Sequence, residues 1–208
     1  MLMKHEWKKQ EKEVYLPKQT PELITIPSHQ FFSIEGEGNP NGEAFAEAIG
    51  VLYSLSYGLK MLPKKGVTPV GYFDYSVYPL EGIWDISDKA KGAKIFDKNE
   101  LVYKIMIRQP DFVDDELAQQ IIEMTKKKKP HVLLDKVKFE RIEDGLCVQM
   151  LHIGAYDDEP KSFEMMKEFC RNNHLLRGDL RHREIYLSDF RKTAPEKLKT
   201  VLRYFVKK

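Results

Sequence analysis

The order in which strand and helix patterns follow one another constrains this 208-residue chain most, because the same order occurs twice. The first copy comprises a strand, a helix and two strands, over residues 30–38, 43–61, 70–84 and 101–110. The second copy repeats that order over residues 144–154, 162–176, 182–189 and 200–207. The sequence therefore predicts an α+β fold built from a tandem pair of β-α-β-β modules.

We expect a single domain over residues 1–208 that consists of four consecutive parts. The expected parts are an N-terminal extension over 1–20, a first module over 21–110, a linking helix over 111–130 and a second module over 131–208. Residues 131–142 are expected to add a strand to the second module. Two modules joined edge to edge would place helices on one face of their antiparallel sheets and a central ligand groove on the other.

The charge pattern argues against nucleic-acid binding. The formal net charge is only +2, and the one basic run, 126–129, follows a helical pattern that begins with Asp114 and Asp115. Acids at the start of a helix and lysines at its end both complement the helix dipole, so the run is expected to be a helix end. No helix-turn-helix pattern precedes the body of the chain.

Several other classes of protein are also disfavoured. No apolar segment is long enough to span a membrane, and the charged start of the chain has no signal-peptide core, so we expect a cytoplasmic protein. Cys147 and Cys170 form no CxxC motif and are expected to be buried, reduced thiols. His152 and His182 lack metal-ligand spacing, and the glycines of 36–42 lack GxGxxG spacing. We therefore expect no metal and no cofactor.

One carboxylate, Glu184, stands inside the expected strand "HREIYLSD" (182–189). Alternation along the strand places Ile185 and Leu187 on one face and Glu184 and Tyr186 on the other. If Ile185 and Leu187 pack beneath the helix of the second module, Glu184 and Tyr186 face the groove, where a ligand could meet them. From the residues alone, a structural acid paired with Arg183 or His182 is the alternative.

Several long motifs resemble the GyrI-like family: "QMLHIGAYDDEP" (149–160), "HREIYLSDFRK", "APEKLKTVLRYFV" and, in the first half, "YPLEGIW" and "YKIMIRQPDFV". The resemblance implies paired β-α-β-β modules around a ligand groove that contains a glutamate and aromatic residues. It places Glu184 at the glutamate position and implies groove roles for Trp84, Tyr156, Tyr103 and Tyr186. Ala155 stands where many members have proline, which would loosen the loop that carries Tyr156.

The resemblance leaves three functions open for a stand-alone protein. In the first, Glu184 is a general base and Tyr156 a hydrogen-bond donor in the hydrolysis of electrophilic, cyclopropane-containing genotoxins. In the second, Glu184 is only a counter-charge for lipophilic cationic drugs, aided by cation–π contacts, in a sequestering or sensing protein. In the third, the chain inhibits gyrase through a protein surface. The expected partner is a hydrophobic aromatic small molecule, and the sequence does not indicate the oligomeric state.

Overall fold

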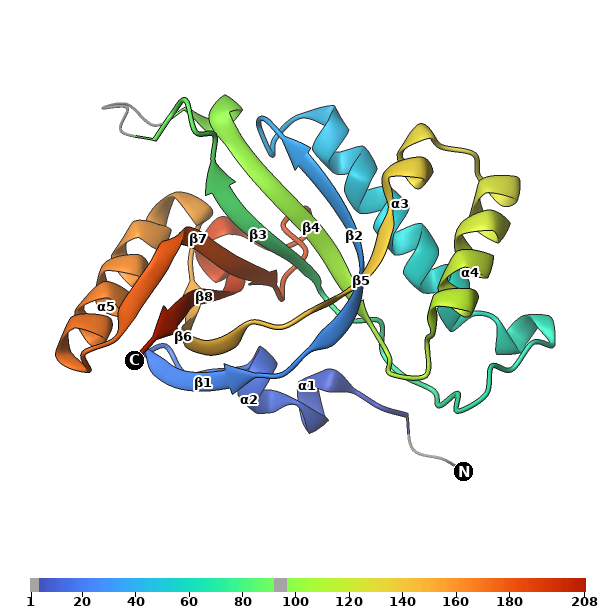
Figure 1. Ribbon diagram of the computed structural model, residues 1–208, viewed down its shortest axis with the longest axis horizontal. Coiled ribbons are helices and arrows are strands. Elements are labelled where there is room, and N and C mark those ends of the chain that lie inside the picture. The colour runs from blue at the N-terminus through green and yellow to red at the C-terminus, as the bar shows by residue number, and fades with distance from the viewer. Residues whose placement is uncertain (1–3, 92–96) are drawn as a thin grey trace. The chain divides into compact units, whose positions relative to one another are not determined.

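The computed structural model describes residues 4–91 and 97–208, and Figure 1 labels the elements along the chain. The helices are α1 (Trp7–Gln10), α2 (Lys12–Tyr15), α3 (Glu43–Lys60), α4 (Asp115–Lys128) and α5 (Glu159–Asn172). The strands are β1 (Glu22–Ile26), β2 (His29–Glu37), β3 (Leu80–Ile86), β4 (Leu101–Gln109), β5 (Lys138–Ile142), β6 (Gly145–Ile153), β7 (Leu176–Tyr186) and β8 (Lys199–Lys207). The predicted α+β class and the antiparallel pairing are confirmed.

The described residues form two compact units. Unit 1 contains residues 4–7, 29–80, 86–91 and 97–142, and unit 2 contains residues 8–28, 81–85 and 143–208.

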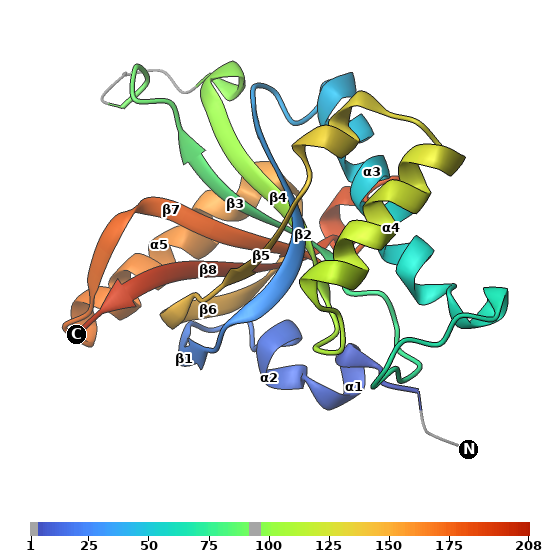
Figure 2. The ribbon, with the colours of Figure 1, turned by 45° about the vertical axis from the view of Figure 1, so that its right-hand side comes forward.

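In unit 1, β2 lies between β4 and β5 and pairs with both in antiparallel register. Helix α3 packs on β2 and β4 because its apolar residues recur at helical spacing; Phe45, Leu52, Leu55 and Leu59 are all buried. Helix α4 packs against α3, as Figure 2 shows. The predicted linking-segment helix is confirmed: the Asp114 carboxylate accepts a hydrogen bond from Leu117 N at 2.8 Å and caps its start.

In unit 2, the strands follow the order β1-β6-β8-β7-β3. Helix α5 covers one face of this sheet (Figure 1) and contributes Met166 and Cys170 to its core. The sheet residues buried against the helix are Val148, Met150, Leu202, Tyr204 and Val206. Because directly paired antiparallel residues point to the same side, the register of β6, β7 and β8 fixes which β7 side chains share this face.

The strand expected over 131–142 exists, but it does not join the second module. Residues Val132–Lys136 form a 3₁₀ helix, and the strand that follows, β5, pairs with β2 of unit 1 through Phe32 and Phe139. Strand β1, which precedes the first copy, pairs with β6 of unit 2. In each unit, the sheet therefore includes a strand that lies outside the corresponding β-α-β-β copy in the sequence. The alternation of residues within a segment predicts a strand but not the strand with which it pairs.

The prediction of a strand over residues 70–84 is wrong for residues 70–79. Only β3, from Leu80 onward, is a strand, and the residues before it form an aromatic cluster in irregular structure. Tyr72, Phe73 and Tyr75 lie 5.2, 5.4 and 6.0 Å from Phe112, between ring centroids. Aromatic residues in alternation pack equally well without a strand partner, so the period of two was misleading here.

No helix of the described residues is long and apolar enough to cross a membrane. Cys147 and Cys170 are both free and buried, as predicted. Burial raises the pKa of the Cys147 thiol to about 12, which keeps it in the unreactive thiol form.

Candidate functional site

The face of β7 that carries Glu184 differs from the predicted one. Glu184 pairs with Leu202 and His182 pairs with Tyr204, and both partners lie in the core beneath α5. Glu184, His182 and Tyr186 therefore share the face that α5 covers, and Ile185 points to the other face. The prediction was wrong because both faces of β7 are buried, so alternation alone could not tell which of them meets the helix.

Glu184 is 9% exposed, and three side chains surround its carboxylate. His182 Nε2 lies 3.0 Å from Oε1, and the Tyr186 hydroxyl donates to Oε2 at 2.7 Å. A carboxylate only accepts hydrogen bonds, so the His182 proton must be on Nε2. Phe163 of α5 contacts the His182 ring edge-on at 4.8 Å and stacks on Tyr204 at 5.4 Å, which fixes the imidazole in place.

Trp84 of β3 completes a chain of hydrogen bonds that ends at Glu184. The Trp84 indole Nε1 donates to the Tyr186 hydroxyl at 2.8 Å, so this hydroxyl both accepts from Trp84 and donates to Glu184. Burial, followed by the charge of Glu184, holds the pKa of Tyr186 well above its ordinary value. The hydroxyl therefore keeps its proton and remains a donor at all physiological pH values.

The third neighbour of Glu184 is a second carboxyl group, on Glu159 at the start of α5. Glu159 is 6% exposed. Burial, the charge of Glu184 and a hydrogen bond between the two carboxyls together raise the pKa of Glu159 to about 10. Near neutral pH Glu159 therefore holds a proton and donates it to Glu184. The pair carries one negative charge and one shared proton.

Tyr156 lies in the loop before α5, and its ring meets the Tyr186 ring edge-on at 6.0 Å. Burial and the charge of Glu184 raise the pKa of Tyr156 to about 12, so its hydroxyl is a hydrogen-bond donor and a poor acid. Tyr156 as a whole residue is 37% exposed, which leaves it accessible to a ligand. The structure thus brings together Glu184, Tyr156, Tyr186 and Trp84, four of the five residues singled out from the sequence.

His152 holds the loop that carries Tyr156. Its Nε2 lies 3.1 Å from the Ala155 carbonyl oxygen and its Nδ1 lies 2.9 Å from Ser162 Oγ. Since a carbonyl only accepts, Nε2 donates to Ala155 and Nδ1 accepts from Ser162. Ala155 has a φ of −66°, the value that proline would impose. The loop therefore adopts a proline-like backbone at Ala155 and is fixed by His152.

Tyr103 belongs to unit 1. It is buried in β4, packs edge-on against Phe45 at 4.9 Å and covers Gly36, where an added Cβ would lie 2.6 Å from the ring. Its ring has these internal contacts, and a role for Tyr103 in ligand binding stays a prediction.

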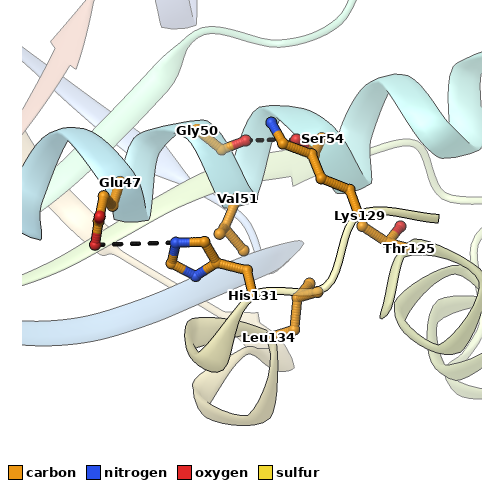
Figure 3. Close-up of a pocket in the computed structure, with 8 residues that line it drawn as sticks. All are labelled: Glu47, Gly50, Val51, Ser54, Thr125, Lys129, His131 and Leu134. Atoms are coloured by element: carbon orange, nitrogen blue, oxygen red, sulfur yellow. Dashed lines mark hydrogen bonds and ion pairs between the residues drawn. The ribbon is translucent and has the colours of Figure 1, made fainter. Parts of the chain in front are cut away.

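A cavity of about 170 Å³ in unit 1 is separate from these residues (Figure 3). It is lined by Glu47, Gly50, Val51, Ser54, Thr125, Lys129, His131 and Leu134. Its hydroxyl and imidazole groups are engaged locally: Ser54 Oγ donates to Gly50 O, Thr125 Oγ1 donates to Ile121 O, and His131 Nδ1 accepts from Leu133 N. These contacts support the local helices and leave Glu184 as the centre of the candidate site. Over residues 4–91 and 97–208, no cluster of His, Cys, Asp and Glu has the geometry of a metal site.

The comparisons with known proteins identify the family. Residues 19–206 match the GyrI-like small molecule binding domain. The chain belongs to the GyrI-like family. The resemblance of its motifs to that family is thereby confirmed. No curated protein matches this chain.

Three solved structures from Listeria innocua are similar to this GyrI-like chain over almost its full length. Two are of hydrolases, each 38% identical, with TM-scores of 0.88 and 0.90; they cover 98% and 99% of this chain and 100% of their own. The third is of an uncharacterized conserved protein, 40% identical, with a TM-score of 0.89, covering 98% of this chain and 100% of its own.

Two neighbours of Glu184 in this GyrI-like chain, Glu159 and His182, are not among the candidate site residues predicted from the sequence. Glu159 lies between the strand expected over 144–154 and the helix expected over 162–176, and an acid next to a proline at a helix start is common and gives no sign of burial. His182 enters the sequence analysis only as a structural partner of Glu184, although its position two residues away in a strand already places it on the same face. The spacing of two residues in a strand was therefore the sequence signal that could have paired His182 with Glu184.

The hydrogen-bond chain through Tyr186 can be tested by Tyr186→Phe. We expect the indole N–H resonance of Trp84 to move in proton–nitrogen NMR spectra because its acceptor is lost. The variant should also lose about 1–3 kcal/mol of unfolding free energy, because the buried indole N–H is left without that acceptor. Trp7, the other tryptophan, donates to Val77 O at 2.9 Å and serves as an internal control. An unmoved Trp84 resonance, assigned with Trp84→Phe, would contradict the contact.

Proposed function

We propose that this GyrI-like protein binds hydrophobic aromatic small molecules beside Glu184 and hydrolyses electrophilic, cyclopropane-containing genotoxins. The observation that carries the proposal is the setting of Glu184: a nearly buried carboxylate, held by His182 and Tyr186 and bordered by aromatic rings. The similarity to two Listeria innocua hydrolases at 38% identity supports a hydrolytic reaction.

The chemistry assigns one role to each group. Glu184 accepts a proton from water, and the water oxygen forms a bond to the strained ring carbon as the carbon–carbon bond of the cyclopropane breaks. The electron pair of that bond moves to the conjugated carbonyl oxygen of the substrate. The Tyr156 hydroxyl donates a hydrogen bond to this oxygen as its charge grows. The second hydrogen of the water stays on the new hydroxyl group, and the proton that Glu184 took passes to the phenolic oxygen, so the product is the substrate plus one water and Glu184 is again a carboxylate.

Aromatic side chains suit a flat, conjugated substrate. Tyr156 and Tyr186 meet edge-on, and Trp84 lies within hydrogen-bond distance of Tyr186, so three π systems are gathered beside one carboxylate. Rings in such a cluster offer stacking and edge contacts to another aromatic system, each worth about 0.5–1.5 kcal/mol.

Binding of lipophilic cations without turnover is the second candidate function. It is favoured by the donors around Glu184, since both His182 and Tyr186 form hydrogen bonds with its carboxylate. A carboxylate held in this way is a good counter-charge, and the nearby rings add cation–π attraction.

Incubation with a duocarmycin-type alkylator distinguishes the two functions. We expect the wild-type protein to convert a molar excess of this neutral, cyclopropane-bearing compound into a product heavier by one water, followed by chromatography and mass spectrometry. Heat-treated protein is the control for spontaneous hydrolysis. Unchanged compound, together with saturable binding of a lipophilic cation such as tetraphenylphosphonium, would replace the hydrolase proposal with the counter-charge function.

A further inference from the structure

His152 is a buried polar residue whose contacts reach the loop that carries Tyr156. It lies near the end of β6, is 5% exposed and is paired with Thr200 of β8, so the sheet fixes its backbone. Its ring uses both nitrogens: Nδ1 lies 2.9 Å from Ser162 Oγ of α5, and Nε2 lies 3.1 Å from the Ala155 carbonyl oxygen. The imidazole therefore joins a strand, a helix and a loop.

The register of the sheet places His152 in line with the candidate site. His152 pairs with Thr200, and Thr200 pairs with Tyr186 of β7. Paired residues of antiparallel strands point to the same face, so His152 and Tyr186 share the face that α5 covers, two strands apart. Neighbouring strands are about 4.8 Å apart, which makes this separation about 10 Å. The loop after β6 spans much of it, because it brings the Tyr156 ring to 6.0 Å from the Tyr186 ring.

The backbone of this loop is shaped to admit the imidazole. Gly154 has a φ of 146°, a value that residues with a side chain rarely adopt. A Cβ added there would lie 3.2 Å from His152 Nε2, so a side chain at this position would press on the ring. The Gly154 amide donates to the Leu198 carbonyl oxygen at 3.0 Å, which holds the start of the loop. Glycine thus lets the chain turn close over His152.

The hydrogen bond from His152 acts on the peptide that precedes Tyr156. The Ala155 carbonyl group and the Tyr156 amide nitrogen belong to one planar unit, so holding the oxygen also orients the Cα of Tyr156. His152 Nε2 donates to this oxygen, and the Asp158 amide donates to it at 2.9 Å. Because Nδ1 accepts from Ser162, the ring keeps the tautomer with its hydrogen on Nε2.

We propose that His152 is a positioning residue: it holds the peptide before Tyr156 so that the Tyr156 hydroxyl is placed to donate to the substrate oxygen. This inference rests on the proposed hydrolase function. In this role His152 exchanges no proton during the reaction. Its contribution is to keep a hydroxyl of an accessible loop in one place before the substrate arrives.

Two substitutions of His152 separate its two contacts. In His152→Gln the amide group stands near the place of Nε2 and can still donate to Ala155. In His152→Asn it stands near the place of Nδ1, where it can accept from Ser162 but does not reach the loop. We expect kcat for the duocarmycin-type compound to stay within about fivefold of wild type in His152→Gln and to fall about 10²-fold in His152→Asn, the loss that a misplacement of about 1 Å can cause. His174→Asn, at an exposed position beyond α5, is the matched control and should leave kcat unchanged.

A double-mutant cycle tests whether His152 acts through Tyr156. Tyr156→Phe is expected to lower kcat about 10²–10³-fold, as loss of a hydrogen-bond donor to a developing charge does. If His152 matters only by placing that hydroxyl, His152→Asn should lower kcat by less than about threefold more once the hydroxyl is absent. Losses that multiply in the double variant would indicate a general structural effect and overturn the inference.

Fluorine NMR of protein labelled with 3-fluorotyrosine follows Tyr156 without turnover. The Tyr156 signal is identified by its loss in Tyr156→Phe. It should stay in place in His152→Gln and move in His152→Asn, because only the second variant releases the peptide before Tyr156. A signal that is the same in wild type and His152→Asn would overturn the inference whether or not wild type is active.

The outcomes separate the inference from the function on which it rests. Hydrolysis by wild type that is unimpaired in His152→Asn, or equally impaired in His152→Asn and His152→Gln, overturns the role of His152 and leaves the hydrolase function standing. Absence of hydrolysis by wild type overturns the hydrolase function, and the fluorine signals then decide alone whether His152 positions Tyr156.

Discussion

Glu184→Gln is expected to lower kcat for hydrolysis of the cyclopropane-bearing substrate by about 10²–10⁴-fold, the usual contribution of a general base. The amide that replaces the carboxylate has nearly the same shape and can still accept a hydrogen bond from His182 or Tyr186 through its oxygen. It cannot take a proton from water. Single-turnover kinetics at neutral pH, with the product measured by mass spectrometry, test this expectation.

Substrate affinity tells whether the loss concerns chemistry or binding. A neutral substrate gains little from the charge of Glu184, so its dissociation constant, measured by quenching of tryptophan fluorescence, should change less than threefold, which is under about 0.65 kcal/mol. A lipophilic cation should bind the variant more weakly, because its counter-charge is lost. A variant that hydrolyses as fast as wild type would remove Glu184 from the mechanism.

Glu140→Gln provides the matched control. Glu140 is also a strand glutamate, in β5 of unit 1, and its carboxylate is paired with Lys104 at 2.9 Å. The same chemical change there should leave kcat and the dissociation constants unchanged. A loss of activity in Glu140→Gln comparable to that in Glu184→Gln would indicate a general effect on the fold.

The sequence predicted β6, α5 and β8 of unit 2 well, because each has a clear period and well-marked ends. It did not predict β1, and β7 spans Leu176–Tyr186 and not the predicted 182–189. It could not predict how those elements combine at Glu184. Trp84 reaches Tyr186 across 102 positions of sequence, and only the family resemblance directed attention to that tryptophan. The partnership of Glu159 and Glu184 depends on how α5 lies on the sheet, which no local pattern encodes.

The face assignment of β7 shows the limit of periodicity in physical terms. Alternation predicts two faces correctly, but it assigns them to core and groove only when one set of residues is apolar and the other is polar. On β7, Arg183 and Ile185 are 1% and 0% exposed and Glu184 is 9% exposed, so neither face is solvated. Because both faces of β7 carry buried charged residues, the strand lacks the contrast between an apolar and a polar face on which the prediction relied.

The second large effect is expected on stability, from the ion-pair network on the face of β7 opposite α5. Asp144 receives hydrogen bonds from Arg183 at 2.6 Å and from Arg203 at 3.0 Å, and Arg183 also contacts Glu81 at 2.8 Å. All four side chains are at most 3% exposed. Two cations and two anions thus compensate one another in a site that is almost closed to solvent.

Arg203 of this network also contributes to hydrogen bonds that hold α2 in unit 2. Arg203 donates to the Val14 carbonyl oxygen at 3.2 Å and to Gln149 Oε1 at 3.0 Å, and Gln149 Nε2 donates to the Glu13 carbonyl oxygen at 2.7 Å. The side chains that neutralise the buried charges therefore also position the residues of α2 over the sheet. Loss of one charge should therefore destabilise both the ion-pair network and the packing of α2.

Asp144→Asn is expected to lower the free energy of unfolding by about 3–5 kcal/mol, since removal of one partner leaves buried charge uncompensated. Against a total stability of about 5–15 kcal/mol, this is a large fraction. Urea unfolding followed by circular dichroism at pH 7 measures it. Asp179→Asn is the matched control: Asp179 forms an exposed pair with Arg181 at 2.7 Å, and exposed pairs contribute about 0–1 kcal/mol. Equal losses in the two variants would contradict a special role for the buried network.

The pH dependence of unfolding tests independently whether the Asp144 charge stabilises the folded protein. Burial alone would raise the pKa of Asp144, but the charges and hydrogen bonds of Arg183 and Arg203 outweigh it, and the pKa is lowered in the folded protein. A lowered pKa means that Asp144 contributes stability above its unfolded pKa of about 3.9, and that this contribution is lost as the pH falls through the folded value. The difference in stability between wild type and Asp144→Asn should therefore be largest near neutral pH and shrink in acid, where both side chains are uncharged. A difference that stays constant down to the acid unfolding of wild type would show that the Asp144 charge is not what stabilises unit 2.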